Sequence, residues 1–112
     1  MKLPVRGQAW DVLAVNWFLY RLNAPRPDFA FTMSESEQQV MGEHFAYWTE
    51  ILDRGQCLIF SPVADPAGVW GAAVVKGESA ADIEALGAGD PAVVAGTCSF
   101  EVMQLLSPVT RA

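Results

Sequence analysis

The sequence is poor in basic residues and has no long hydrophobic run. Seven Lys and Arg stand against thirteen Asp and Glu in 112 residues, so the formal net charge is −6. Nucleic-acid backbones and anionic membranes are bound by clustered positive charge, and we therefore expect neither as a partner. No window approaches the roughly 18 apolar residues of a membrane span. We expect no secretory signal, because the leader at residues 1–11 lacks an apolar segment.

Cysteine and histidine are also scarce. Cys57 and Cys98 lie in apolar, strand-like segments, which is typical of buried free thiols. Two cysteines cannot build a disulfide framework or a zinc ribbon, and the single histidine, His44, has no second histidine at ligand spacing. We therefore expect no metal and no cofactor, and the reduced thiols favour a cytoplasmic protein.

Apolar residues, in contrast, are abundant for so short a chain. They make up 52% of the sequence and include four Trp and six Phe. A chain of this length suits one domain and has a large surface for its volume. Either a second copy of the chain or a ligand in a cavity would cover the excess, and the two alternatives are compatible. We expect a homodimer, with one domain over residues 12–107 and a polar tail over 108–112.

Hydrophobic periodicity predicts strands and helices separated by turn residues. β-Branched and aromatic residues favour the strands, and the pairs Ser34–Glu37 and Ser79–Asp82 fit helix N-terminal caps. Gly55 suits the end of the first helix. The predicted elements are a strand at 12–22, a helix at 34–53, strands at 56–63 and 69–76, a helix at 80–88, a helical turn at 91–95 and a strand at 97–106.

The order β-α-β-β-α-β is that of a ferredoxin-like α+β fold. Two helices then cover one face of a four-stranded antiparallel sheet. The first strand lies inside the sheet, and the second and fourth lie at opposite edges, which keeps Cys57 and Cys98 too far apart to bond within one chain. The open face of the sheet matches the excess of apolar residues, and two such sheets packed face to face would bury it.

The first predicted helix carries the histidine on its apolar side. Its stripe follows the i, i+3, i+4, i+7 spacing of a buried helix face and contains Val40, Met41, His44, Phe45, Tyr47, Trp48, Ile51 and Leu52. An imidazole on such a stripe is either a polar core residue with a hydrogen-bonded partner or part of a site. The long loop at 23–33 holds two phenylalanines, and long loops with aromatic residues often close over a site.

The chain resembles the YCII-related (YciI-like) family over residues 16–106. The resemblance rests on the order and spacing of short segments, namely EHFAYW at 43–48, Gly55, FSPV at 60–63, DPAG at 65–68, and DPAV at 90–93 with Gly96. It implies a dimeric α+β barrel with one pocket per subunit between the sheet and the partner. It also implies similarity to small barrel enzymes such as muconolactone isomerases and a dehydrochlorinase acting on a chlorinated hydroxyhydroquinone.

In that family a histidine and an aspartate are proposed to act together. His44 matches the family histidine, and Asp90 matches the aspartate of the family's Asp-Pro pair. Two positions depart from the family pattern. Ser61 stands where the family usually has Gly, which fills space near a ligand, and Asn23 stands where it often has an acid, which removes a proton acceptor or an orienting partner.

The chemistry expected of these residues is proton transfer. A neutral imidazole takes and gives protons near neutral pH, and a carboxylate at its other nitrogen holds it in one tautomer. Asp90 is the expected partner of His44, and Asp65 is the alternative. Helix capping also explains Asp90, and turn formation also explains Asp65. Tyr47 lies one helical turn from His44 and is a candidate donor to an oxyanion.

Two further residues are candidates for substrate binding. Ser61 ends a strand, where its hydroxyl could reach a ligand, and Arg21 could bind a carboxylate unless its charge is simply solvated. The sequence thus predicts a small-molecule-binding lyase or isomerase that needs no cofactor, with His44 as general base and Asp90 as its orienting partner. The alternative is a non-catalytic ligand-binding or structural dimer in which His44 is a core histidine.

Overall fold

The computed structural model of the chain describes residues 15–111. Within this range helices and strands share one small α+β body, which confirms the predicted class. The elements are β1 (Asn16–Asn23), α2 (Phe29–Thr32), α3 (Glu35–Asp53), β2 (Cys57–Val63), β3 (Trp70–Gly77), α4 (Ala80–Ala88), α5 (Pro91–Val94) and β4 (Ser99–Gln104).

The strands form one sheet in the order β2-β3-β1-β4, and every neighbouring pair is antiparallel. The predicted interior position of β1 and the edge positions of β2 and β4 agree with this order. Along β1 the buried residues alternate: Phe18, Tyr20 and Leu22 are buried, and the residues between them are half-buried. One face of the sheet therefore packs on the core, and the other does not.

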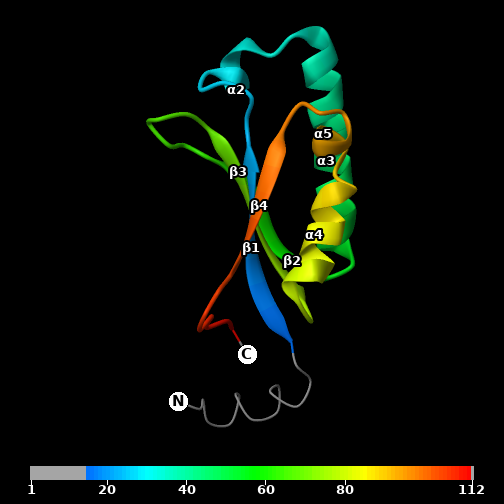
Figure 1. The fold of residues 1–112 in the computed structure, drawn as a ribbon, viewed down its shortest axis with the longest axis vertical. Helices are drawn as coiled ribbons and strands as arrows, with labels where there is room; N and C mark the ends of the chain where they lie inside the picture. Colours follow the sequence, from blue (N-terminus) through cyan, green and yellow to red (C-terminus); the bar gives the residue numbers. More distant parts are fainter. Residues whose placement is uncertain (1–14, 112) are drawn as a thin grey trace.

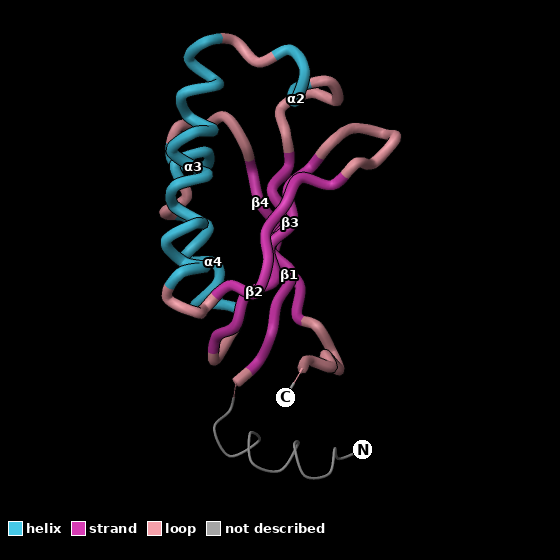
Figure 2. Tube along the Cα trace, turned by 180° about the vertical axis from the view of Figure 1, so that it is seen from behind, coloured by secondary structure: helices cyan, strands magenta, loops and turns pink. Residues whose placement is uncertain are grey.

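The helices lie on one side of the sheet. α3 and α4 run along the same side in both ribbon views (Figure 1, Figure 2). The short α5 contacts α3, and α2 lies near the N-terminal end of α3, at the top of Figure 1. No helix from residues 15–111 covers the opposite face. The layers are thus one sheet and one layer of helices, with an open sheet face.

Helix α3 begins and ends where its residues predict. The Ser34 hydroxyl accepts a hydrogen bond from the Glu37 N–H at 3.1 Å, and the Glu37 carboxylate accepts one from the Ser34 N–H at 2.9 Å. This reciprocal capping box satisfies two backbone donors that the helix leaves unpaired. Gly55 follows the helix with φ of 83°, in the left-handed region that glycine adopts without strain.

The segment between β1 and α3 is more ordered than the predicted loop at 23–33. It contains the single-turn helix α2, in which the Phe31 N–H donates to the Asp28 carbonyl at 2.9 Å. Phe29 is buried, and Phe31 is 82% exposed. The loop prediction therefore missed the short helix α2, in which the Phe29 side chain is buried.

The last strand, Ser99–Gln104, is shorter than the predicted 97–106. The N–H groups of Thr97 and Cys98 donate to the Ala92 carbonyl at 3.1 and 3.0 Å, so they end α5 and do not join the sheet. The first strand begins at Asn16. The predictions for residues 12–14 and for the leader at 1–11 lie outside the described residues.

The buried face of α3 is narrower than its apolar stripe. Trp48 and Ile51 are each 1% exposed, but Phe45 is 61% and Leu52 36% exposed. The sheet covers only one side of the helix, so the edge of the stripe stays outside the core. Phe45 instead packs edge-on against the Phe60 ring, with centroids 5.7 Å apart.

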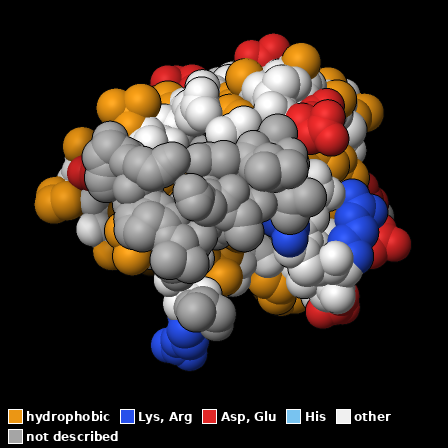
Figure 3. All heavy atoms as spheres, turned by 90° about the horizontal axis from the view of Figure 1, so that it is seen from below, with side chains coloured by type: hydrophobic (Ala, Val, Ile, Leu, Met, Phe, Trp, Pro, Cys, Tyr) orange, Lys and Arg blue, Asp and Glu red, His pale blue; other side chains and the backbone are white. Residues whose placement is uncertain are grey.

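Other hydrophobic side chains are exposed along the sheet edges and the C-terminal segment. They include Leu58, Ile59, Met103, Leu106 and Val109. Seen from below, hydrophobic atoms at the surface lie between scattered acidic and basic side chains (Figure 3). Among the described residues, no helix is long and apolar enough to cross a membrane.

Candidate functional site

A cavity of about 360 Å³ lies between α3 and the sheet, beneath α2. Helix α3 lines it with Met41, His44, Phe45 and Trp48, and α2 lines it with Phe29 and Ala30. The strands and their ends complete the wall with Tyr20, Leu22, Ala24, Met33, Phe60, Ser61, Pro62, Val69, Trp70, Gly71, Ala72, Ala73 and Cys98. Pockets of this volume and apolar character are typical of small-molecule sites.

His44 stands between this cavity and a buried carboxylate. Its Nδ1 lies 2.9 Å from both Asp90 oxygens, and its side chain is 17% exposed. Asp90 is fully buried and does not line the cavity. The pairing predicted from the sequence is therefore present, and Asp90, not Asp65, is the partner.

Three more donors surround the Asp90 carboxylate. The Tyr20 hydroxyl and the Trp48 Nε1–H each donate to Oδ2 at 2.9 Å. The Ala92 backbone N–H donates to Oδ1 at 2.9 Å, so Asp90 also caps α5. A carboxylate that accepts this many hydrogen bonds is strongly favoured in its ionised form.

The electrostatics of the cluster follow from these contacts. Burial raises the pKa of the Asp90 carboxyl, but hydrogen bonds from His44 and Trp48 outweigh it and leave that pKa below its usual value. Burial and the neighbouring Asp90 charge raise the pKa of the Tyr20 hydroxyl far above its ordinary value. Tyr20 thus stays a neutral donor, and Asp90 stays a carboxylate near neutral pH.

An ionised Asp90 fixes the orientation of the imidazole. A carboxylate only accepts hydrogen bonds, so the Nδ1 of a neutral His44 must carry the hydrogen. Nε2 is then the lone-pair nitrogen, and it has no hydrogen-bond partner within the described residues. Because no buried side-chain nitrogen or oxygen in this range lacks a partner, Nε2 is accessible. The imidazole therefore offers one basic nitrogen on the side away from Asp90.

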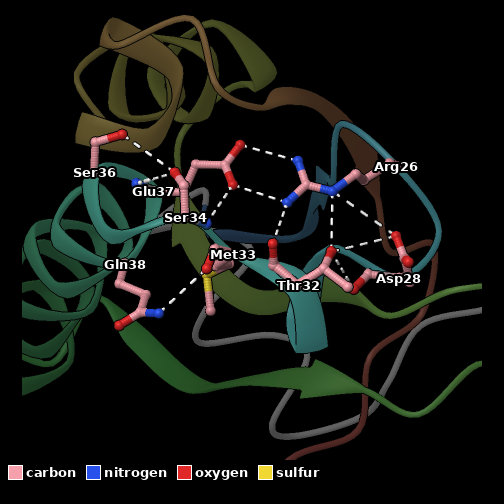
Figure 4. A network of polar contacts seen from close by, with 8 residues as sticks. All are labelled: Arg26, Asp28, Thr32, Met33, Ser34, Ser36, Glu37 and Gln38. Carbon is pink, nitrogen blue, oxygen red and sulfur yellow. Dashed lines mark hydrogen bonds and ion pairs between the residues drawn. The ribbon is translucent and has the colours of Figure 1, made fainter.

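Arg26 holds in place the α2 segment, which lines one side of the cavity and is called its roof below. Its guanidinium donates to both Glu37 oxygens at 2.8 and 3.0 Å, and to the Thr32 carbonyl at 2.7 Å (Figure 4). It also lies 5.2 Å from the centre of the Phe29 ring. Hydrogen bonds from Arg26 and Ser34 lower the pKa of Glu37 to about 2. The roof and the start of α3 are thus held as one unit.

The structure does not bring every predicted residue to the cavity. The Tyr47 hydroxyl donates to the Leu86 carbonyl at 2.7 Å, and Tyr47 does not line the cavity, so the structure does not place this predicted oxyanion donor beside a ligand there. Asp65 accepts from the Ala67 N–H at 2.9 Å and from the Trp70 Nε1–H at 3.0 Å, as a turn residue does.

Arg21 also lies apart from His44. It is on the opposite face of β1 from Tyr20, where its guanidinium stacks 4.2 Å from the centre of the Trp70 ring and its Nε donates to the Asn23 side chain at 3.0 Å. It lines a separate, shallower hollow. Ser61 does line the cavity, but its hydroxyl donates to the Pro62 carbonyl at 2.8 Å.

Tyr20 and Trp48 are the site residues that sequence reasoning missed. Trp48 belongs to the apolar stripe predicted for α3, and Tyr20 lies on the buried face of β1. A buried Tyr hydroxyl or Trp N–H almost always has a hydrogen-bond partner. Two such donors on core-facing positions were therefore a signal that a buried acceptor lies between β1 and α3.

The cysteines are free thiols, as predicted. Cys98 lines the cavity, and burial together with the Asp90 charge raises the pKa of its thiol to about 11. It is therefore a neutral, poorly nucleophilic group. In the part of the chain that the structure describes, no group of three or more His, Cys, Asp or Glu could hold a metal ion.

No protein-family model, curated protein or solved structure matches the chain. The resemblance to the YciI-like family therefore stays a prediction. Evidence on function comes from the side chains around the cavity.

Proposed function

We propose that this protein binds a small molecule in the His44 cavity and transfers a proton there with a His-Asp pair. The observation that carries the proposal is the position of His44, whose Nδ1 is held 2.9 Å from a buried carboxylate while its side chain lines the cavity. A base oriented in this way is the recurring arrangement of general-base catalysis. The reaction class is a cofactor-independent lyase or isomerase of the YciI-like type.

The chemistry needs only His44 and the ligand. Nε2 takes a proton from an acidic C–H, and the electron pair of that bond stays on the ligand. In a lyase this pair forms a double bond, the leaving group departs with the electron pair of the bond that breaks, and the proton on Nε2 then passes to the leaving group or to water. In an isomerase the proton returns from Nε2 to a different carbon. Asp90 keeps Nδ1–H in place throughout and stabilises the imidazolium that forms.

We also propose a ferredoxin-like subunit that pairs through its open sheet face, as in a dimeric α+β barrel. The strand order and the single helix layer support this arrangement. One row across the open face is apolar on all four strands, with Ile59 opposite Val74, and Leu19 opposite both Val74 and Met103. Ile59 is 57% and Met103 42% exposed. The buried free thiols support a reducing, cytoplasmic location.

Sedimentation velocity tests the pairing. We expect a dimer for the natural chain and a monomer for Leu19→Glu, because the substitution buries a charge in the centre of the interface. Gln39→Glu adds the same charge on exposed α3 and should stay dimeric. A natural chain that sediments as a monomer at all concentrations would contradict this part of the proposal.

A second candidate function is a binding protein without catalysis. Asp90 favours it, because the same carboxylate caps α5 and is saturated with donors from Tyr20 and Trp48. In this alternative His44 is one more donor that satisfies a structural carboxylate. The two candidates share the cavity and differ in whether Nε2 ever takes a proton from a ligand.

Hydrogen exchange into bound ligands separates the two candidates. A thermal-shift screen of small C–H acids first supplies ligands, and each is then incubated with the protein in D₂O while ¹H NMR follows its acidic C–H. We expect the natural chain to accelerate exchange and His44→Gln to bind without accelerating it. The glutamine amide can still donate to Asp90, so the fold keeps its hydrogen bond.

Glu43→Gln is the matched control, since Glu43 is exposed and precedes the histidine on α3. It should exchange as the natural chain does. Ligands that bind without accelerated exchange in any variant would leave only the binding function. A screen in which no ligand stabilises the natural chain would remove both.

A further inference from the structure

We propose that the His44 cavity selects uncharged, largely apolar molecules that present a single hydrogen-bond donor to His44 Nε2. This inference rests on the proposed function, because it takes the same cavity as the ligand site. It adds the class of ligand and excludes carboxylates, phosphates and ammonium ions.

The preference for uncharged ligands is inferred from the side chains that line the cavity. Within residues 15–111, no Lys, Arg, Asp or Glu lines the cavity. The nearest arginines are committed elsewhere, Arg26 to Glu37 and Arg21 to Asn23 and the Trp70 ring. An ionised ligand would lose its hydration without gaining a counter-charge, which is strongly unfavourable in apolar surroundings. Asp90 behind His44 adds repulsion for anions.

A cation is not favoured either, although aromatic rings line the cavity. Asp90, the carboxylate behind the imidazole, is fully buried and already accepts from Tyr20 and Trp48, and Glu37 beside α2 is paired with Arg26. Within residues 15–111, no side chain with a full negative charge lines the cavity to pair with an ammonium group. The ring faces alone attract a cation only weakly, and this attraction is smaller than the free energy that the cation loses on dehydration.

The preference for a ligand with one hydrogen-bond donor is inferred from the donors and acceptors in the cavity wall. The nitrogen and oxygen donors among the wall's side chains are all used inside the protein: Tyr20 and Trp48 donate to Asp90, Trp70 donates to Asp65, and Ser61 donates to the Pro62 carbonyl. Nε2 of His44 is the side-chain nitrogen left over, and with hydrogen on Nδ1 it accepts. A ligand that places an O–H, N–H or acidic C–H there satisfies it, whereas a ligand rich in acceptors finds only the weak S–H donor of a cysteine side chain.

The volume limits the ligand's size. About 360 Å³ lies at the lower end of the range for small-molecule pockets. One or two fused rings fit this space, and the aromatic side chains of Phe29, Phe60 and Trp48 suit a flat, apolar partner.

Four naphthalene derivatives of nearly equal shape test the proposal by calorimetry near neutral pH. 2-Naphthol is neutral and donates one hydrogen bond, 2-methoxynaphthalene is neutral and cannot donate, 2-naphthoate is an anion, and 2-naphthylmethylammonium is a cation. We expect 2-naphthol to bind about tenfold more tightly than the methyl ether, which corresponds to one hydrogen bond. We expect both ions to bind at least about 100-fold more weakly than 2-naphthol.

A new positive charge in the wall should change the anion result. Met33→Lys places an ammonium at the cavity rim, and we expect it to bind 2-naphthoate at least about tenfold more tightly than the natural chain does. Gln39→Lys adds the same charge on exposed α3, outside the cavity, and should not. Equal gains in both variants would mean that net charge, not the wall, sets the selectivity, and would overturn the proposal.

The outcomes distinguish a failure of the inferred ligand selectivity from a failure of the proposed ligand-binding function. If 2-naphthoate or the ammonium ion binds as tightly as 2-naphthol, the selectivity is wrong and the cavity is still a ligand site. If the methyl ether binds as tightly as 2-naphthol, Nε2 is not the acceptor that we infer. If none of the four compounds binds although the thermal-shift screen supplies other ligands, the selectivity alone is wrong. If the screen supplies no ligand either, the ligand-binding function fails as well.

Discussion

His44 Nδ1 lies 2.9 Å from both carboxylate oxygens of Asp90, across 46 residues of sequence. The contact joins the middle of α3 to the residue that caps α5. One carboxylate therefore serves the fold and orients the imidazole at the same time. A substitution at His44 or Asp90 is therefore expected to change both the stability of the fold and the chemistry of the ligand site.

Asp90→Asn should destabilise the protein by at least about 2 kcal/mol, because hydrogen bonds to a charged acceptor contribute about 1.5–3 kcal/mol each. The amide nitrogen of asparagine cannot accept, so either the Ala92 N–H at Oδ1 or the donors of Tyr20 and Trp48 at Oδ2 lose their partner. Urea unfolding followed by tryptophan fluorescence measures the change.

Asp53→Asn is the control for this substitution, since Asp53 is exposed at the end of α3. It should change the free energy of unfolding by no more than about 0.5 kcal/mol. Equal effects of the two substitutions would mean that the buried carboxylate contributes nothing special to stability.

The contribution of Asp90 to the free energy of unfolding should depend on pH, and its pKa in the folded protein sets the direction of that dependence. Its pKa in the folded protein lies below the usual value, so its stabilisation is complete above the unfolded-state pKa, about 3.9, and is lost as the pH falls through the folded-state pKa. The difference in free energy of unfolding between the natural chain and Asp90→Asn should therefore shrink as the pH falls below about 4. A difference that stays constant down to about pH 3 would show that Asp90 does not titrate as inferred.

Loss of the Arg26–Glu37 contact should loosen the roof of the cavity. In Arg26→Gln the two hydrogen bonds to Glu37 and the bond to the Thr32 carbonyl are weakened or absent, and α2 is too short to hold itself in place (Figure 4). We expect faster amide hydrogen exchange over residues 28–33 and faster ligand release, with little change in β1.

Glu35→Gln offers a comparison in the same turn of α3. It removes an exposed carboxylate near Glu37 that has no contact with Arg26. Exchange over residues 28–33 should keep its natural rate. If Arg26→Gln exchanges no faster than Glu35→Gln, the guanidinium is not what holds the roof.

Two glycines inside helices should respond to alanine in opposite directions. A Cβ at Gly87 would lie 2.5 Å from the Phe100 ring, whereas a Cβ at Gly42 would meet nothing within 4 Å. Gly87→Ala should cost about 1–3 kcal/mol through overpacking, and Gly42→Ala should gain about 0.5–1 kcal/mol through helix propensity. Denaturant unfolding of both variants checks the packing of α4 on β4, and stabilisation by Gly87→Ala would contradict it.

Local sequence signals predicted most of the architecture. The capping box of Ser34 and Glu37 and the αL glycine Gly55 placed the ends of α3 because both act within a few residues. The helix α2 was missed because a single turn carries too few residues for a periodic pattern. Its position depends on Arg26 reaching Glu37, a contact between segments.

The site was predicted only in part, for the same physical reason. The pairing of His44 with Asp90 followed from the family resemblance, but the donors Tyr20 and Trp48 depend on how β1 packs against α3. Tyr47 shows the limit most clearly. Its spacing from His44 is correct for one helical turn, yet its hydroxyl reaches Leu86 on α4 instead of the cavity.

The nitrogen spectrum of His44 tests the account most directly, because the chain has one histidine and its imidazole signals need no assignment. Selective ¹⁵N labelling of untagged protein, at a pH where the imidazole is neutral, reports which ring nitrogen carries the hydrogen. We predict the Nδ1–H tautomer with a lone pair on Nε2, and a change in the Nε2 shift, but not in the tautomer, when a ligand such as 2-naphthol binds. A neutral imidazole with hydrogen on Nε2, or one that exchanges freely between tautomers, would contradict a base held by Asp90 and aimed at the cavity.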